Sequence, residues 1–109
     1  MTVEQFSKDT GFTAIILPDK SREVQGAYVG DLLSWVMGRA KSDNAWITIM
    51  SNLNVIAVAT LTDVSCIIFA EGVIPDKELV DVAESKGVNL LISELSSYDT
   101  AVAVSRILS

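Results

Sequence analysis

The side chains that could perform a reaction are few, and their types narrow the chemistry. The 109-residue sequence contains no His and a single Cys, Cys66. A Ser–His or Cys–His nucleophile pair and a His/Cys zinc site therefore cannot be assembled, and no disulfide can form within the chain. Cys66 opens an apolar run, so we expect a small buried side chain rather than a reactive thiol.

Carboxylates are the remaining candidates for acid–base chemistry. They include Asp31, Asp63, Glu71, Glu94 and Asp99, and nothing in the sequence around them marks a catalytic site. Neither phosphate-binding pattern, G-x-x-x-x-G-K-S/T or G-x-G-x-x-G, occurs in the chain. We predict that the chain is not an enzyme and that it uses no cofactor and no metal ion.

The elements that would position these groups alternate between short apolar runs and helical patterns. The expected strands are Phe12–Leu17, Val24–Tyr28, Ala45–Met50, Cys66–Ala70 and Val88–Ile92. The expected helices lie between Thr2 and Gly11, over Asp31–Lys41, over Val55–Thr62, from Pro75-Asp76 to Lys86, and from Ser96 or Ser97 to Leu108. Because the first two strands are close in sequence, we expect them to form a hairpin or a neighbouring pair.

Strands that alternate with helices at this spacing imply βαβ units with right-handed crossovers. We therefore predict an α/β fold: a layered domain with a mainly parallel sheet of about five strands and helices packed on it. Residues 1–109 are expected to form one such domain, with no linker or second domain.

Small and hydrogen-bonding residues gather where the strands are expected to end. Ligands of open parallel sheets bind beyond the carboxyl ends of the strands, where helix N-termini point free amides. The candidate ligand-binding residues are Gly26, Gly30, Asp31, Ser51, Asn52, Glu71, Gly72, Ser96 and Ser97. They suit a polar or anionic ligand, although Asp31 and Glu71 would repel an anion. The alternative is that Ser, Asn and Asp serve only as helix caps.

Two predicted helices are candidates for a subunit interface. In Asp31–Lys41 the apolar positions are Leu32, Leu33, Val36, Met37 and Ala40, and Trp35 points away from them. Trp35 either lies across its own surface or forms a subunit contact. Val55–Thr62 is apolar almost all round, so we expect the sheet to cover one side and a second subunit the other. The candidate interface residues are Trp35, Val55, Val58, Ala59 and Thr62.

Composition limits the partners. The net charge of -6 argues against binding to a nucleic-acid backbone. The N-terminus shows no apolar signal core, and no run approaches the roughly 18 apolar residues of a membrane span. We therefore expect a cytoplasmic protein that binds neither nucleic acid nor a membrane.

The stretch Arg22-Glu-Val-Gln-Gly-Ala-Tyr-Val-Gly-Asp-Leu-Leu-Ser-Trp-Val-Met37 resembles the DRTGG domain family. The resemblance continues through Trp46-Ile-Thr-Ile, Asn54-Val-Ile-Ala-Val-Ala59 and Ile67-Ile-Phe-Ala-Glu-Gly72, and is strongest to small stand-alone members. The signature is partly kept, because Gln25-Gly26-Ala27 stands where the family often shows Thr-Gly-Gly. Ala does not adopt a positive φ cheaply, so a ligand contact that needs a second Gly would be lost.

The resemblance implies the fold of the N-terminal domain of HPr kinase/phosphorylase, whose phosphate-binding loop lies in a separate domain. DRTGG domains accompany CBS domains, phosphotransacetylases and inorganic pyrophosphatases as regulatory modules, and they tend to pair as dimers. The implied function is a non-catalytic regulatory or scaffolding module that acts as a homodimer, with an enzyme encoded nearby as a further partner. The alternative is a sensor that binds an adenine nucleotide or a similar anion at the strand ends or the dimer interface.

Overall fold

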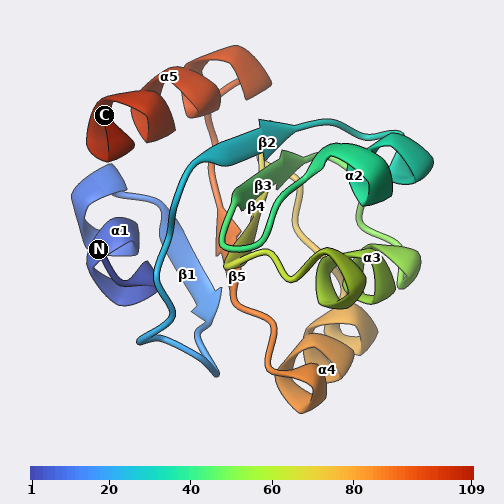
Figure 1. The fold of residues 1–109 in the computed structure, drawn as a ribbon. Helices are drawn as coiled ribbons and strands as arrows, with labels where there is room; N and C mark the ends of the chain where they lie inside the picture. Colours follow the sequence, from blue (N-terminus) through green and yellow to red (C-terminus); the bar gives the residue numbers. More distant parts are fainter.

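The computed structural model describes residues 1–109 and contains five helices and one five-stranded sheet (Figure 1). In chain order the elements are α1 (Val3–Thr10), β1 (Thr13–Ile16), β2 (Ala27–Val29), α2 (Leu33–Arg39), β3 (Ala45–Thr48), α3 (Asn54–Thr62), β4 (Cys66–Phe69), α4 (Lys77–Lys86), β5 (Leu90–Ile92) and α5 (Ser97–Leu108). No helix is both long enough and apolar enough to cross a membrane.

The sheet has the strand order β1-β5-β4-β3-β2. Strands β2, β3, β4 and β5 are parallel, and β1 joins the β5 edge antiparallel. The predicted α/β architecture with a mainly parallel sheet is therefore confirmed.

The predicted pairing of the first two strands is wrong, because β1 and β2 form opposite edges of the sheet. The connection between them crosses the end of the sheet and is held there by Asn89. The amide of Asn89 exchanges two hydrogen bonds with the backbone of Asp19, of 2.9 and 3.0 Å. The second strand is also shorter than predicted and begins only at Ala27.

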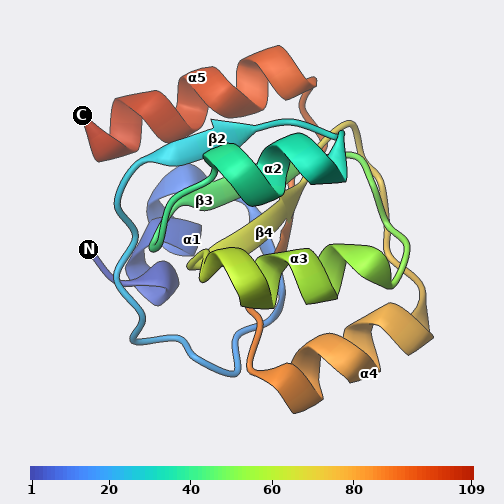
Figure 2. The ribbon, with the colours of Figure 1, turned by 45° about the vertical axis from the view of Figure 1, so that its right-hand side comes forward.

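Helices cover both faces of the sheet. Helices α1 and α5 lie on one face, and α2, α3 and α4 lie on the other (Figure 2). The strand residues alternate between the two cores: Trp46 and Ile67 face α2–α4, whereas Ile47 and Cys66 face α1 and α5. The sheet is thus the middle of three layers.

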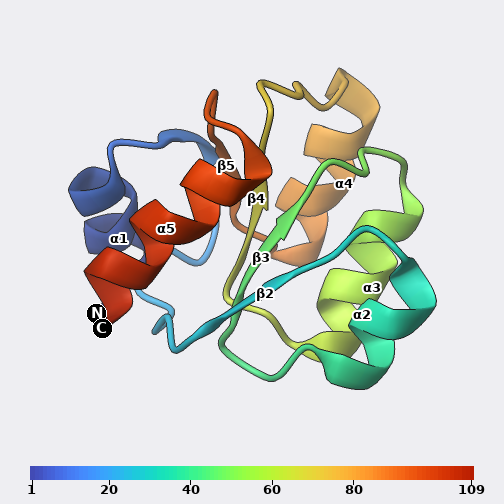
Figure 3. The same cartoon turned by 90° about the horizontal axis from the view of Figure 1, so that it is seen from above.

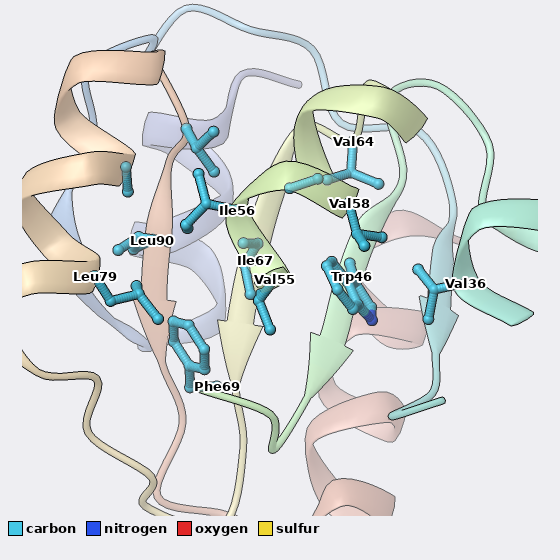
Figure 4. Close-up of a cluster of buried hydrophobic side chains, with 13 residues drawn as sticks. Val36, Trp46, Val55, Ile56, Val58, Val64, Ile67, Phe69, Leu79 and Leu90 are labelled. Carbon is cyan, nitrogen blue, oxygen red and sulfur yellow. The ribbon is translucent and has the colours of Figure 1, made fainter. Parts of the chain in front are cut away.

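The chain itself buries one side of helix α3, which includes three of the four candidate interface residues of this helix. Val55, Val58 and Ala59 are at most 5% exposed, and Figure 4 shows Val55 and Val58 directed toward the side chains of the sheet. Helices α2 and α4 flank α3 on either side. The expectation that a second subunit is needed to cover these three residues is therefore wrong, because the neighbouring helices supply the cover.

Side chains cap three helices as their sequences predict. Thr2 Oγ1 accepts a hydrogen bond from the Gln5 amide (3.2 Å), Asp76 Oδ1 from the Leu79 amide (2.9 Å) and Ser96 Oγ from the Asp99 amide (3.0 Å). Helix α3 has no side-chain cap, although Asn52 Oδ1 accepts a hydrogen bond from the Asn54 amide (2.9 Å) just before it.

Candidate functional site

The carboxyl ends of the four parallel strands meet at one edge of the sheet, which we call the rim. Eight of the candidate ligand-binding residues follow these strand ends: Gly30, Asp31, Ser51, Asn52, Glu71, Gly72, Ser96 and Ser97. Gly26 does not belong to the rim, because it precedes β2 and therefore lies at the opposite end of that strand.

Asp31 ties two rim loops together. Its Oδ1 accepts hydrogen bonds from Thr48 Oγ1 (2.8 Å) and from the Ile49 amide (2.9 Å). The carboxylate therefore fixes the loop after β3 to the loop after β2. This contact explains why an acidic residue follows β2 without assigning it a ligand.

Glu71 occupies the N-terminus of α5. Its Oε2 accepts a 2.6 Å hydrogen bond from the Ser97 amide, and its own amide donates to Leu95 O (2.8 Å). Glu71 and Gly72 both have positive φ values, of 60° and 70°, which form the tight turn that brings this carboxylate to the helix. A helix N-terminus favours a negative charge. Here the chain's own carboxylate takes the place that an external anion would occupy.

A polar groove lies beside the carboxyl end of β5. It has a volume of about 370 Å³ and is lined by Thr10, Gly11, Phe12, Thr13, Ile92, Ser93, Glu94 and Leu95. Ser93 Oγ is already engaged at the edge of the groove by Thr100 Oγ1 (2.8 Å) and by the Leu95 amide (3.2 Å). The sequence analysis did not single out this groove, because only the tertiary fold brings the end of α1 next to β5.

Gly26 has a structural role. Its φ is 70°, and a Cβ built at this position would lie 3.1 Å from Asn44 Nδ2. That amide group donates to Gln25 O (2.9 Å). Ala27 is an ordinary strand residue, so the positive φ of the signature falls on Gly26 alone. Ala in place of a second Gly therefore causes no backbone strain.

Exposed apolar side chains gather on and before α2. Val29 (49% exposed), Leu32 (57%), Trp35 (53%) and Met37 (51%) are the exposed side chains of what we call the 29–37 surface. Val29 lies on the α5 side of the sheet, whereas Leu32, Trp35 and Met37 belong to the α2 side. The Arg39 guanidinium lies over the Trp35 ring, 3.9 Å from its centroid. The predicted apolar face of this helix is thus partly wrong. Only Val36 is fully buried, because α2 begins at Leu33 and leaves Leu32 outside the packed face.

Of the remaining reactive groups, Cys66 is buried, and burial raises the pKa of its thiol to about 12. A thiol with this pKa is not a nucleophile at neutral pH. No group of three or more His, Cys, Asp or Glu side chains could hold a metal ion. The sites that remain are the rim, its polar groove and the exposed apolar surface, all of which suit binding.

The chain thus has a layered α/β fold whose rim is closed by its own carboxylates. Residues 45–108, more than half of the chain, match the family model described as "HPr Serine kinase N terminus". The chain belongs to this family. The match runs from β3 through α5 and leaves residues 22–37 outside it. No curated protein sequence matches the chain.

A solved structure has the same fold. It is the crystal structure of the CBS and DRTGG domains of the regulatory region of Clostridium perfringens pyrophosphatase, complexed with its activator diadenosine tetraphosphate. The similarity covers 94% of this chain and 45% of that one, with a TM-score of 0.75 and 13% sequence identity. This chain therefore spans less than half the length of that regulatory region, and the likeness concerns the fold.

Proposed function

We propose that the chain is a non-catalytic regulatory or scaffolding module that acts as a homodimer and exerts its effect on an enzyme partner. Four findings support this function. The family is the HPr kinase N-terminal one, and the structural neighbour is part of a regulatory region. In addition, the acidic groups at the rim hold the protein's own loops together, and the single thiol is buried.

The observation that carries the proposal is the 29–37 surface. Four of the eleven large hydrophobic side chains that the protein exposes lie within these nine residues. Among them, Trp35 is half-exposed with the Arg39 guanidinium over its ring, and Trp and Arg are both enriched where surfaces become buried in interfaces. Trp35 is the side chain for which this role is proposed.

Light scattering over a range of micromolar concentrations tests the homodimer. We expect a species of twice the monomer mass that dissociates on dilution. A Trp35→Ala variant should weaken the dimer at least tenfold, and Leu61→Ala, which removes an equally apolar exposed side chain from α3, is the matched control. A monomer at every concentration would contradict the proposal, and an unchanged dimer in Trp35→Ala would remove only that residue from the interface.

A second candidate function is a sensor of an adenine nucleotide or similar anion. The specific observation in its favour is the 370 Å³ polar groove beside the rim, next to the α5 N-terminus. An anion that reached this helix N-terminus would have to displace the carboxylate of Glu71. Binding and release of Glu71 would then be coupled, which would give the ligand a way to move the loop after β4.

A thermal-shift panel of adenine nucleotides at millimolar concentration tests the sensor. A ligand at 100 times its dissociation constant adds about 2.7 kcal/mol to the stability of the protein, so binding would be visible. The Glu71→Gln variant should bind an anion more tightly, because the competing charge is gone. The absence of any shift in both proteins would rule the sensor out.

A further inference from the structure

We propose that two copies of the chain associate by antiparallel pairing of their β2 strands, so that two five-stranded sheets become one continuous sheet. This inference rests on the proposed homodimer and names the surface that forms it. The occupant of the β2 edge is therefore a second copy of this chain.

The first argument is the open edge of β2. The strand pairs only with β3, through Gly30 N to Ile47 O (3.1 Å) and Ala45 N to Gly26 O (3.0 Å). Because the direction of backbone groups alternates along a strand, the N–H and C=O groups of Ala27 and Val29 point outward. In the view from above, β2 runs between α5 and α2 with no ribbon drawn across it (Figure 3).

The second argument is that, although β2 is only three residues long, its edge lacks the other features that normally prevent strand addition. Soluble proteins protect their edge strands with charged side chains, Pro, β-bulges or a covering segment. The sequence of β2 is Ala-Tyr-Val, its pairing with β3 is regular, and no Pro adjoins it. Val29 is half exposed on this edge.

The third argument is the register that a two-fold axis would impose. With the axis at Tyr28, Ala27 of one copy lies opposite Val29 of the other, and these outward-facing residues exchange four hydrogen bonds in all. Gly26 then lies opposite Gly30, so no side chains collide at the strand ends. Gln25 lies opposite Asp31, and no like charges meet along the pairing.

The fourth argument is the apolar groove beside the edge. It has a volume of about 310 Å³ and lies between β2 and α5, lined by Gly26, Ala27, Val29, Ile47, Ala101, Val104, Ser105, Leu108 and Ser109. In the proposed register, Val29 of the second copy lies beside Ala27 on this same face of the sheet. Its methyl groups would therefore be placed at the groove and be removed from water.

Disulfide cross-linking tests the register. The two Tyr28 residues would form a non-hydrogen-bonded pair with a Cα–Cα distance of about 4.5 Å, which a disulfide can span. Tyr28→Cys should form a covalent dimer on mild oxidation, and Cys66 will not interfere because it is buried. Thr13→Cys, which is exposed on the opposite edge of the sheet, is the matched control and should remain monomeric on denaturing gels.

A backbone variant tests the hydrogen bonds without relying on Tyr28, which is half-buried. Val29→Pro removes one of the two outward N–H groups of β2 and leaves the pairing with β3 in place. We expect the dissociation constant of the dimer to rise at least tenfold while the circular dichroism spectrum stays unchanged. Two outcomes would overturn the edge pairing and leave the homodimer itself standing. One is a Val29→Pro variant that dimerises as tightly as the wild type, and the other is a Tyr28→Cys variant that does not cross-link although the wild type is dimeric. A monomeric wild type would overturn both.

Discussion

The two edges of the sheet differ in how readily they could pair with a further strand. At the β1 edge, the strand has an irregularity between Ala14 and Ile16, and Pro18 follows shortly after its end. At the β2 edge, the strand is regular, uncharged and flanked by glycines. A bulge and a Pro both discourage strand addition. The β1 edge is therefore protected against strand addition, whereas the β2 edge has neither a bulge nor a Pro.

The open edge is also anchored by side chains at both of its ends. Arg22 Nε donates to Asp43 Oδ1 (2.9 Å), and Arg22 Nη2 donates to Asp63 O (2.7 Å), which fixes the segment that leads into β2. Trp46 Nε1 donates to Gly30 O (2.9 Å) at the other end. An edge that is held in place before it meets a partner loses less conformational entropy on binding.

Removing the support beneath β2 should have the largest effect. Trp46 is fully buried, so Trp46→Ala should cost about 3–5 kcal/mol of unfolding free energy, measured by urea denaturation. The same change should also increase hydrogen exchange at Gly30, whose carbonyl loses its partner. Phe6→Ala, on the opposite face, is the control: it should destabilise the protein without this local effect. Equal exchange at Gly30 in the two variants would show that Trp46 does not hold the edge.

Replacement of Gly26, which has a positive φ just before β2, should have the next largest effect on stability. Gly26→Ala should cost about 2 kcal/mol, since an L-residue is strained at this φ and the new Cβ meets the Asn44 amide. Gly38→Ala is the matched control, because Gly38 lies within α2 and its Cβ would project into open space. That change should stabilise the protein by about 0.5–1 kcal/mol. Opposite signs in thermal unfolding are expected, and equal effects would contradict the assigned strain.

A charge placed at each edge compares the two edges directly. Val29→Lys should raise the dissociation constant of the dimer about tenfold, or about 1.4 kcal/mol, because Lys is a typical edge-blocking residue. Thr13→Lys at the exposed start of β1 should leave it unchanged. Analytical ultracentrifugation of both variants measures the two dissociation constants. A larger rise in the dissociation constant for Thr13→Lys than for Val29→Lys would contradict the assignment of β2 as the pairing edge.

The smallest effect concerns the pH dependence of the anchor. Hydrogen bonds from Ser42 and from Arg22 lower the pKa of Asp63. A lowered pKa means that the ionised carboxylate stabilises the fold at neutral pH and that this contribution is lost below about pH 4. Ser42→Ala, which removes the 2.8 Å hydrogen bond to Asp63 Oδ2, should narrow the difference in melting temperature between pH 7 and pH 3. An unchanged difference would mean that Ser42 does not set this pKa.

Local patterns predicted the elements well because their causes are local. Thr2 and Asp76 cap helices within three residues of themselves, and buried runs such as Cys66–Phe69 form central strands. The pairing of β1 could not be predicted in the same way, because it depends on β5 at the other end of the chain. Closeness in sequence favoured a hairpin or a neighbouring pair, whereas the two strands lie at opposite edges of the sheet.

The positions of the rim residues could be predicted from the sequence, but their hydrogen-bond partners could not. The sequence placed Asp31 and Glu71 at strand ends, and the structure brings both to the rim. What it could not reveal is that Asp31 binds the loop after β3 and Glu71 binds the start of α5. Both contacts join loops that are distant in sequence. The burial of Val58 was likewise a tertiary outcome, because α2 and α4 supply the cover that a single helix pattern cannot show.

The pairing of β1 with β5 also limits the order in which the sheet can form. Thr13 pairs with Ile92, so β1 stays unpaired during synthesis until β5, the last of the five strands, has been made. Contacts between residues so far apart in sequence slow folding, because the loop must close before they form. A nascent chain that ends before β5 would leave Ile15 and Ile16 without a neighbouring strand. We therefore expect chains truncated before Leu90 to aggregate during synthesis, whereas a chain that includes β5 closes its sheet in a late step.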